Sequence, residues 1–381
     1  MSSEVFGIYG LAVVILLSLL GMRIGFVLGF VGAVGLTLMR GWPAAFGQLG
    51  LIPYRVGSLY VLSTVPLFIL MGHFAFHSGM SEMAFKATRL WLIRVRGGLG
   101  MATMMGCAAF AATSGSSVAN SAVMGQLALP EMRANGYNIR FAAGLIAIGG
   151  TIGILIPPST AFILYGIFTE TSIGKLFAAG ILPGLVIVAL LCITISVWSR
   201  FKPGLVGYTT DISTPSWGER IRSLTGALPF LGTFFLVMGS IYGGIATPTE
   251  AASLGCTFCF LYLLIRGKLT WGLIVDVFLD TGRTTGMIFV ILIGGFLFSS
   301  FMGFTGLPVF IIAKIEAMAL PPYGVLAILL VLLFIMGMFF DALSMILITL
   351  PLIMPIIKEL GFDTVWFGVI IVIMMEIAMV T

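Results

Sequence analysis

Apolar stretches of about 20 residues recur from one end of the chain to the other, and each is long enough to cross about 30 Å of hydrocarbon as a helix. The 381 residues are 60% hydrophobic and only 9% charged. A single soluble core could not bury this much apolar surface. The sequence therefore predicts an all-α polytopic membrane protein, in which a formal net charge of +5 indicates cytoplasmic loops rather than nucleic-acid binding.

The basic residues set the expected orientation. With the N-terminus outside, 14 of the 19 Lys and Arg residues fall on the cytoplasmic side, as the positive-inside tendency requires. No Lys or Arg precedes Arg23, so the first apolar stretch lacks the basic region of a cleavable signal peptide and is expected to be retained. The expected spans lie near residues 5–21, 25–40, 59–78, 139–168, 176–199, 226–245, 249–265, 286–307 and 364–381, with residues 41–58 along the interface.

Two further apolar stretches are predicted to form re-entrant helical hairpins. The first, 99–134, has basic residues at both flanks, so it leaves and returns on the inside. Its middle, residues 112–120, is polar enough to be the turn, and such backbone survives at membrane depth only inside protein or against water. The second hairpin, 322–357, starts and ends outside, between Lys314 and Lys358.

An internal repeat relates these two hairpins. Pro130 and Gly136 have the same spacing as Pro355 and Gly361, which lie 225 residues later. The same offset pairs the polar turn at 112–117 with residues 337–342. Because the hairpins open from opposite sides, the repeats have inverted topology, which is typical of secondary transporters with a site at the bilayer midplane.

The helix after the first hairpin is predicted to break in mid-span. Residues 149–159 read GGTIGILIPPS, and the adjacent Pro157 and Pro158 have no N–H to continue the helix. A break exposes carbonyl oxygens that suit Na⁺, and helix N-termini that attract a carboxylate. The repeat also predicts a proline after Thr381, so we expect the chain to be truncated inside its last helix.

These features give two predicted cation sites and a set of substrate contacts. The expected ligands of the first Na⁺ are Ser114, Ser117, Gly153, Ile156 and Pro157. Those of the second Na⁺ are Gly337, Ala378 and Thr381. The expected substrate contacts are Ser116, Asn120, Thr151, Asp341 and Ser344.

Several residues also have a purely structural interpretation. Small residues in membrane helices often serve only to let two helices pack closely, and taken by itself Gly153 could be explained in this way. Thr247 and Glu250 fit a capping box, and we favour that structural role. Asp341 must be paired, hydrated or near a cation at this depth, whereas Glu376 is either proton-linked or faces a scaffold. His73 and His77 lie one helical turn apart and could bind a metal, but no third metal ligand is apparent. A metal site at these two histidines is therefore disfavoured.

The chain resembles the large membrane subunit of tripartite ATP-independent periplasmic (TRAP) transporters, of the DctM type, over essentially its whole length. The resemblance rests on residues 113–117 (TSGSS), 153–159 (GILIPPS), 246–252 (ATPTEAA) and 337–341 (GMFFD). It implies Na⁺-coupled uptake of a small organic acid by an elevator movement. It also implies a small membrane subunit, a periplasmic substrate-binding protein, and a place in the bacterial inner membrane with a periplasmic N-terminus. The family's last helix continues through a Thr-Pro-Pro motif that this chain does not reach.

The elevator architecture implies a division into scaffold and transport parts. Residues 1–98 would be scaffold helices with an interfacial arm, and 99–175 the first transport repeat, made of hairpin 99–134 and broken helix 139–168. Residues 176–307 would hold further scaffold helices, a second arm and the start of repeat 2. Residues 322–381 would complete the second transport repeat with hairpin 322–357 and last helix 364–381.

Three other functions stay open at this point. A self-sufficient divalent-anion/Na⁺ symporter of related architecture would need no binding protein. A membrane-embedded hydrolase or transferase is disfavoured, because the sequence has no HExxH motif and no paired intramembrane aspartates. A channel is disfavoured because hairpins that enter from opposite faces suit alternating access better.

Overall fold

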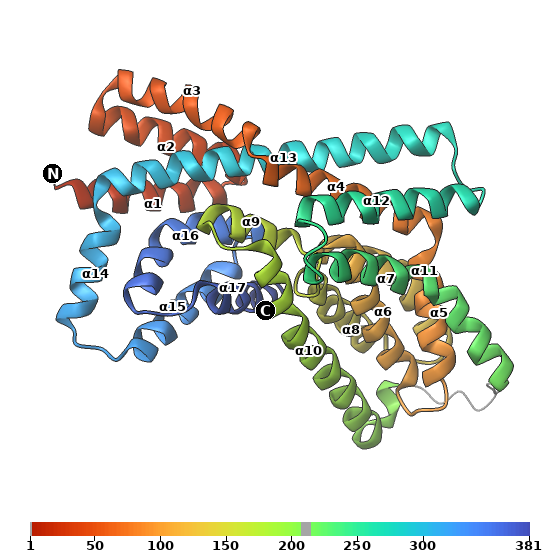
Figure 1. Cartoon of the computed structure of the whole chain (residues 1–381). Coiled ribbons are helices and arrows are strands. Elements are labelled where there is room, and N and C mark those ends of the chain that lie inside the picture. Colours follow the sequence, from red (N-terminus) through yellow and green to blue (C-terminus); the bar gives the residue numbers. More distant parts are fainter. Residues whose placement is uncertain (1, 207–214) are drawn as a thin grey trace.

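The computed structural model describes residues 2–206 and 215–381, and every regular element in this part of the chain is a helix (Figure 1). The predicted all-α polytopic fold is confirmed. Within the described residues, six helical segments are long and apolar enough to cross a membrane. They are η1 and α4 together (Tyr60–Ser63 and Thr64–Ser78), α10 (Ile173–Phe201), α11 (Trp217–Tyr242), α12 (Pro248–Ile265), α13 (Trp271–Thr305) and α16 (Ala342–Glu359).

The remaining helices are shorter. These helices are α1 (Ser3–Leu19), α2 (Ile24–Arg40), α3 (Trp42–Ser58), α5 (Met80–Leu92), α6 (Gly98–Ser114), α7 (Ser117–Ala134), α8 (Ile139–Thr151), η2 (Ile152–Ile154), α9 (Thr160–Thr169), η3 (Pro203–Leu205), α14 (Leu307–Ala317), α15 (Pro322–Gly337) and α17 (Thr364–Met379). Two of them end at a glycine with positive φ: Gly41 ends α2 with φ of 81°, and Gly115 ends α6 with φ of 58°.

Two helices extend well beyond the spans expected from hydropathy. Helix α13 begins at Trp271 rather than near 286, and α11 begins at Trp217 rather than near 226. In α11, a capping box between Ser216 and Glu219 fixes the early start. Charged residues interrupt the apolar pattern of the sequence. They do not end the helix, because a charged side chain on an exposed turn is compatible with helical backbone. Helix α12 starts with the expected capping box of Thr247 and Glu250.

Both hairpins and the helix break are visible as helix boundaries. Helices α6 and α7 meet at Gly115 and Ser116, and α15 and α16 are joined by residues 338–341. Helix α8 tightens into η2 and stops, and the next helix, α9, begins only after residues 155–159. Pro157 and Pro158 lie in this gap, as expected for residues that cannot donate a helical hydrogen bond.

The 225-residue repeat extends to the capping residues. Both bounds of α16 lie 225 residues after those of α7, and α17 starts 225 residues after α8. The N-caps correspond too: Ser116 caps α7 and Asp341 caps α16, each through its side-chain oxygen. Gly136 and Gly361 have nearly equal φ of 76° and 75°. The second arms of the two hairpins, α7 and α16, therefore form through the same local chemistry.

The long helix α13 runs across much of the fold (Figure 1). Helix α13 runs along α2 and continues past α3 to α4, while α12 packs on α4, and α5 packs on α11. Figure 1 shows α13 crossing the upper side, with the α15–α16 hairpin below one end and the α6–α7 hairpin below the other. Helix α10 lies between the hairpins and contacts both α6 and α17. This arrangement brings the two hairpin tips toward each other.

Candidate transport site

A cavity of about 550 Å³ lies between the tips of the two hairpins. Hairpin α6–α7 contributes Ser114, Ser116 and Ser117 to its wall, and hairpin α15–α16 contributes Asp341 through Leu343. Helices α4 and α13 close the other side, with side chains that include His73, Phe76, Thr284 and Met287. Residues more than 200 positions apart in the sequence therefore share one chamber.

The first hairpin tip is tied to the start of α9. Gly115 adopts φ of 58°, and its carbonyl oxygen accepts a hydrogen bond from the Thr160 hydroxyl at 2.8 Å. A Cβ atom at Gly115 would lie 2.7 Å from the Pro158 carbonyl oxygen, so only glycine permits this approach. The tip is thereby fixed against the backbone that follows the helix break.

The predicted ligands of the first cation lie together around this junction. Ser117 Oγ donates to Glu376 Oε1 at 2.9 Å and lies 3.4 Å from the Thr151 carbonyl oxygen. A Cβ on Gly153 would be 3.0 Å from the Ser116 carbonyl oxygen, so η2 packs closely against the tip. Ile156 and Pro157 are buried in the break itself.

Unpaired oxygen atoms around this junction test whether the site suits a cation. Among the described residues, the buried Ser114 Oγ, Asn120 Oδ1 and Glu376 Oε2 have no hydrogen-bond partner. Buried polar atoms are normally satisfied, so three orphaned oxygens near one helix break need an explanation. Hard cations prefer oxygen ligands, and unwound backbone beside them adds carbonyl oxygens. The residues present therefore fit Na⁺.

The predicted second cation site is only partly assembled. Gly337 at the end of α15 lies directly against Ala378 of α17, where a Cβ on Gly337 would overlap the Ala378 methyl group. Thr381 follows α17, is exposed, and donates its hydroxyl to the Ile377 carbonyl oxygen at 2.7 Å. The structure thus brings two of the three residues together.

Some of the predicted substrate contacts line the cavity, and the others are buried among the helices that surround it. Ser116 and Asp341 line the cavity. The Asp341 carboxylate accepts from the backbone N–H groups of Leu343 and Ser344 and from the Ser344 hydroxyl. Ser344 is itself buried, and so is Asn120, whose amide donates to the Cys107 and Gly150 carbonyl oxygens at 3.1 and 3.2 Å.

Thr151 also lies outside the cavity wall. Its hydroxyl donates to the Ile148 carbonyl oxygen at 2.7 Å, within its own helix. Residues that reasoning from the sequence did not assign to the substrate site do line it, above all His73 of α4 and Thr284 of α13. The sequence offered one signal for His73: Ile69, His73 and Phe76 have helical spacing and so lie on one face of α4. This spacing does not show which other helix that face packs against.

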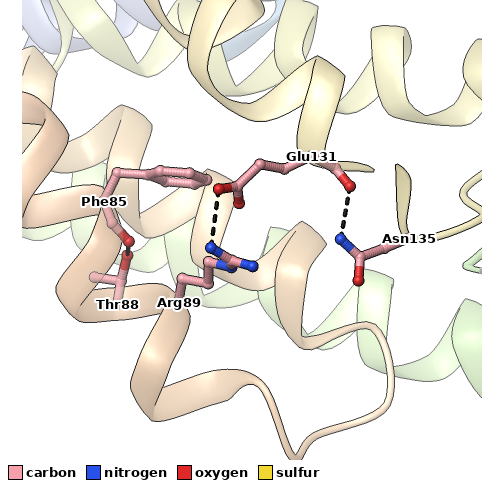
Figure 2. A network of polar contacts seen from close by, with 5 residues as sticks. All are labelled: Phe85, Thr88, Arg89, Glu131 and Asn135. Carbon is pink, nitrogen blue, oxygen red and sulfur yellow. Dashed lines mark hydrogen bonds and ion pairs between the residues drawn. The ribbon is translucent and has the colours of Figure 1, made fainter. Parts of the chain in front are cut away.

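A polar network away from the cavity joins α5 to the first hairpin. Arg89 Nη1 lies 2.9 Å from Glu131 Oε1, and both side chains are about one third exposed (Figure 2). The Asn135 amide donates to the Glu131 carbonyl oxygen at 2.7 Å and closes the end of α7. In Figure 2, Phe85 and Thr88 come from the same helix as Arg89. This ion pair crosses the boundary between residues 1–98 and the hairpin.

Two inverted helical hairpins whose tips meet at one cavity define a secondary transporter with its site at the repeat interface. The family description that matches residues 11–381 is the tripartite ATP-independent periplasmic transporter, DctM component. The chain belongs to this family of transporter permeases, which are not enzymes and which work with a periplasmic binding protein.

Individual relatives agree with this assignment. The chain is 33% identical over 355 residues to the C4-dicarboxylate TRAP transporter large permease protein DctM of Pseudomonas aeruginosa, covering 93% of this chain and 82% of that protein. It is 31% identical over 364 residues to the sialic acid TRAP transporter large permease protein SiaM of Vibrio cholerae, covering 95% and 83%. A crystal structure of the Alcanivorax borkumensis YdaH transporter matches the fold with a TM-score of 0.58 at 15% identity, covering 89% of this chain and 76% of that one.

Proposed function

We propose that this chain takes up a small organic acid together with Na⁺ across the bacterial inner membrane. A periplasmic binding protein would deliver the acid, and a small membrane subunit would complete the transporter. The N-terminus would lie in the periplasm. The observation that carries this proposal is the cavity shared by the tips of both hairpins.

The charges in the cavity favour cotransport of a cation. His73 and Asp341 are the ionisable residues among the described ones that line it, so no Lys or Arg there offsets a bound carboxylate. Two anionic groups in one cavity with mostly apolar walls repel each other. The N-termini of α7 and α16 supply partial positive charge, and bound Na⁺ would supply the rest.

The arrangement of helices supports an elevator movement. The hairpins, the broken helix and α17 contact one another around the cavity, whereas α2, α12 and α13 pack mainly with other long helices. In the proposed cycle the first group carries substrate and Na⁺ past the second. The names of two relatives, a C4-dicarboxylate and a sialic acid permease, favour a carboxylate as the substrate class.

The test is uptake into proteoliposomes that contain the chain with its small subunit and binding protein. Labelled acid should accumulate only when an inward Na⁺ gradient is imposed, and an equal K⁺ gradient should not replace it. Uptake that is unchanged without Na⁺ would rule out sodium coupling. Uptake that needs no binding protein would instead identify a self-sufficient anion/Na⁺ symporter.

A further inference from the structure

Glu376 is a buried carboxylate that is only half satisfied. It lies in α17 and is 7% exposed. Its Oε1 accepts the Ser117 hydroxyl at 2.9 Å, but its Oε2 has no hydrogen-bond partner among the described residues. An ionised carboxylate that has lost its water is costly unless a positive charge or further donors compensate.

The surrounding helices provide no such charge. Helix α17 packs against α8, η2, α9, α10, α15 and α16, and Glu376 also contacts Ser117 of α7. Elements η2, α9 and α15 contain no Lys, Arg or His. The basic residues of the other four helices lie near helix ends: Arg133, Arg140, Lys175, Arg200 and Lys358. The ion pairs in the described part of the chain are Arg89 with Glu131 and Arg283 with Asp280. Glu376 is therefore stable in this position either as the neutral, protonated acid or with a cation that comes from outside the chain.

One more unpaired oxygen, Asn120 Oδ1, lies on the same side of α7 as the Ser117 hydroxyl. Asn120 is one helical turn beyond Ser117 and is completely buried. Both amide hydrogen bonds of Asn120 use Nδ2, which leaves Oδ1 without a partner. Ser117 approaches the Thr151 carbonyl oxygen while Asn120 binds that of Gly150, so both side chains meet the end of α8. An acid and neutral oxygen ligands thus gather where the two repeats touch.

We infer that Glu376 supplies the negative charge of the first Na⁺ site, as a ligand from the second repeat to a site otherwise built by the first. The inference rests on the sodium coupling proposed above. In the 225-residue repeat, Glu376 corresponds to Thr151, and Ser117 corresponds to Ala342. The residue that would reach the second site in the same way is Thr151, which carries no charge.

Thermal unfolding of the purified protein in detergent, titrated with Na⁺ at constant ionic strength against choline, tests this inference. A ligand that binds only the folded protein raises the melting temperature. Wild type should respond to Na⁺. Glu376→Gln keeps an oxygen that accepts from Ser117 but removes the charge, so it should melt higher than wild type without Na⁺. Its Na⁺ midpoint should rise about tenfold, which corresponds to about 1.4 kcal/mol.

Two further variants keep the result interpretable. Glu359→Gln removes an exposed acid at the end of α16 and should titrate like wild type. Glu376→Asp keeps the charge at a shorter reach, so it should retain a Na⁺ response even if Glu376→Gln fails to fold. A Glu376→Gln protein with wild-type stability and a wild-type Na⁺ midpoint would overturn the inference alone. A wild-type protein that ignores Na⁺ would overturn sodium coupling together with it.

Discussion

The Thr160 hydroxyl donates to the Gly115 carbonyl oxygen across 2.8 Å and so joins the start of α9 to the tip of the first hairpin, 45 residues earlier in the chain. The contact spans the helix break, because residues 155–159 lie between η2 and α9. It holds the tip in one position relative to the predicted cation ligands.

Replacing Thr160 with Val should loosen this tip. The change keeps the side-chain shape and removes the hydroxyl, so we expect a loss of about 1 kcal/mol of stability and a weaker Na⁺ response. Thermal unfolding with and without Na⁺ measures both effects. Thr194→Val is the matched control, since the Thr194 hydroxyl is exposed and bonds only within α10. Equal behaviour of the two variants would mean that the Thr160 hydroxyl does not hold the tip, since the 3.5 Å bond from the Thr160 backbone N–H to the Gly115 carbonyl oxygen remains in the Val variant.

Adding a methyl group at Gly153 should damage the first cation site. The new Cβ would lie 3.0 Å from the Ser116 carbonyl oxygen and 3.2 Å from the Asn120 Cβ, so η2 and the hairpin tip must move apart. We expect Gly153→Ala to raise the Na⁺ concentration for half-maximal uptake several-fold. Gly144→Ala in α8 is the control, because a Cβ there meets open space. A Gly153→Ala transporter with normal Na⁺ dependence would show that this glycine serves packing alone.

His73 should contribute to substrate affinity, because its ring lines the cavity from α4. Loss of one hydrogen bond to a carboxylate costs about 1.5 kcal/mol, so His73→Ala should raise the KM for uptake about tenfold. His77 lies one turn further along α4 and is absent from the cavity wall, so His77→Ala should leave KM near that of wild type. Uptake kinetics at saturating Na⁺ would decide between the two residues. Equal effects of the two changes would exclude direct contact of His73 with substrate.

The Arg89–Glu131 pair should couple α5 to the first hairpin only weakly. Both side chains are about one third exposed, and pairs of this kind contribute about 0.2 to 1 kcal/mol after solvent screening. A double-mutant cycle with Arg89→Gln and Glu131→Gln should give this coupling energy from thermal unfolding. The coupling should shrink when salt is raised from 0.1 to about 1 M, because the Debye length falls to about 3 Å. A coupling energy that is independent of salt would contradict an electrostatic link.

The sequence predicted those features that depend on local chemistry. The double proline at 157–158 indicated the helix break, and the polar residues 112–120 indicated the first hairpin tip. Hydropathy underestimated α13, because Asp276, Asp280 and Arg283 lie on exposed helical turns that continue the same helix. Hydrophobic periodicity identifies the buried face of a helix, but it does not identify the helix that packs against that face.

Contacts between distant segments lay beyond such reasoning. The Ser117–Glu376 hydrogen bond joins residues 259 positions apart, and one sequence contains no signal that pairs them. Reasoning from the sequence alone left Glu376 between a proton-linked role and a scaffold contact. Its place against Ser117 depends on how α17 is rotated, which tertiary packing decides. The same holds for His73, which was not predicted to contact substrate.

Helix α13 has a consequence for the lipid around the protein. Its 35 residues make a rod about 52 Å long, far more than the hydrocarbon thickness of about 30 Å. Residues 284–305 carry no charge and account for about 33 Å of that length. The turns around Phe278 and Gly282 lie beside Leu67 and Leu70 of the α4 span, so a tilt across the hydrocarbon accommodates the excess length of α13. A thinner or thicker bilayer should therefore change how far this helix tilts.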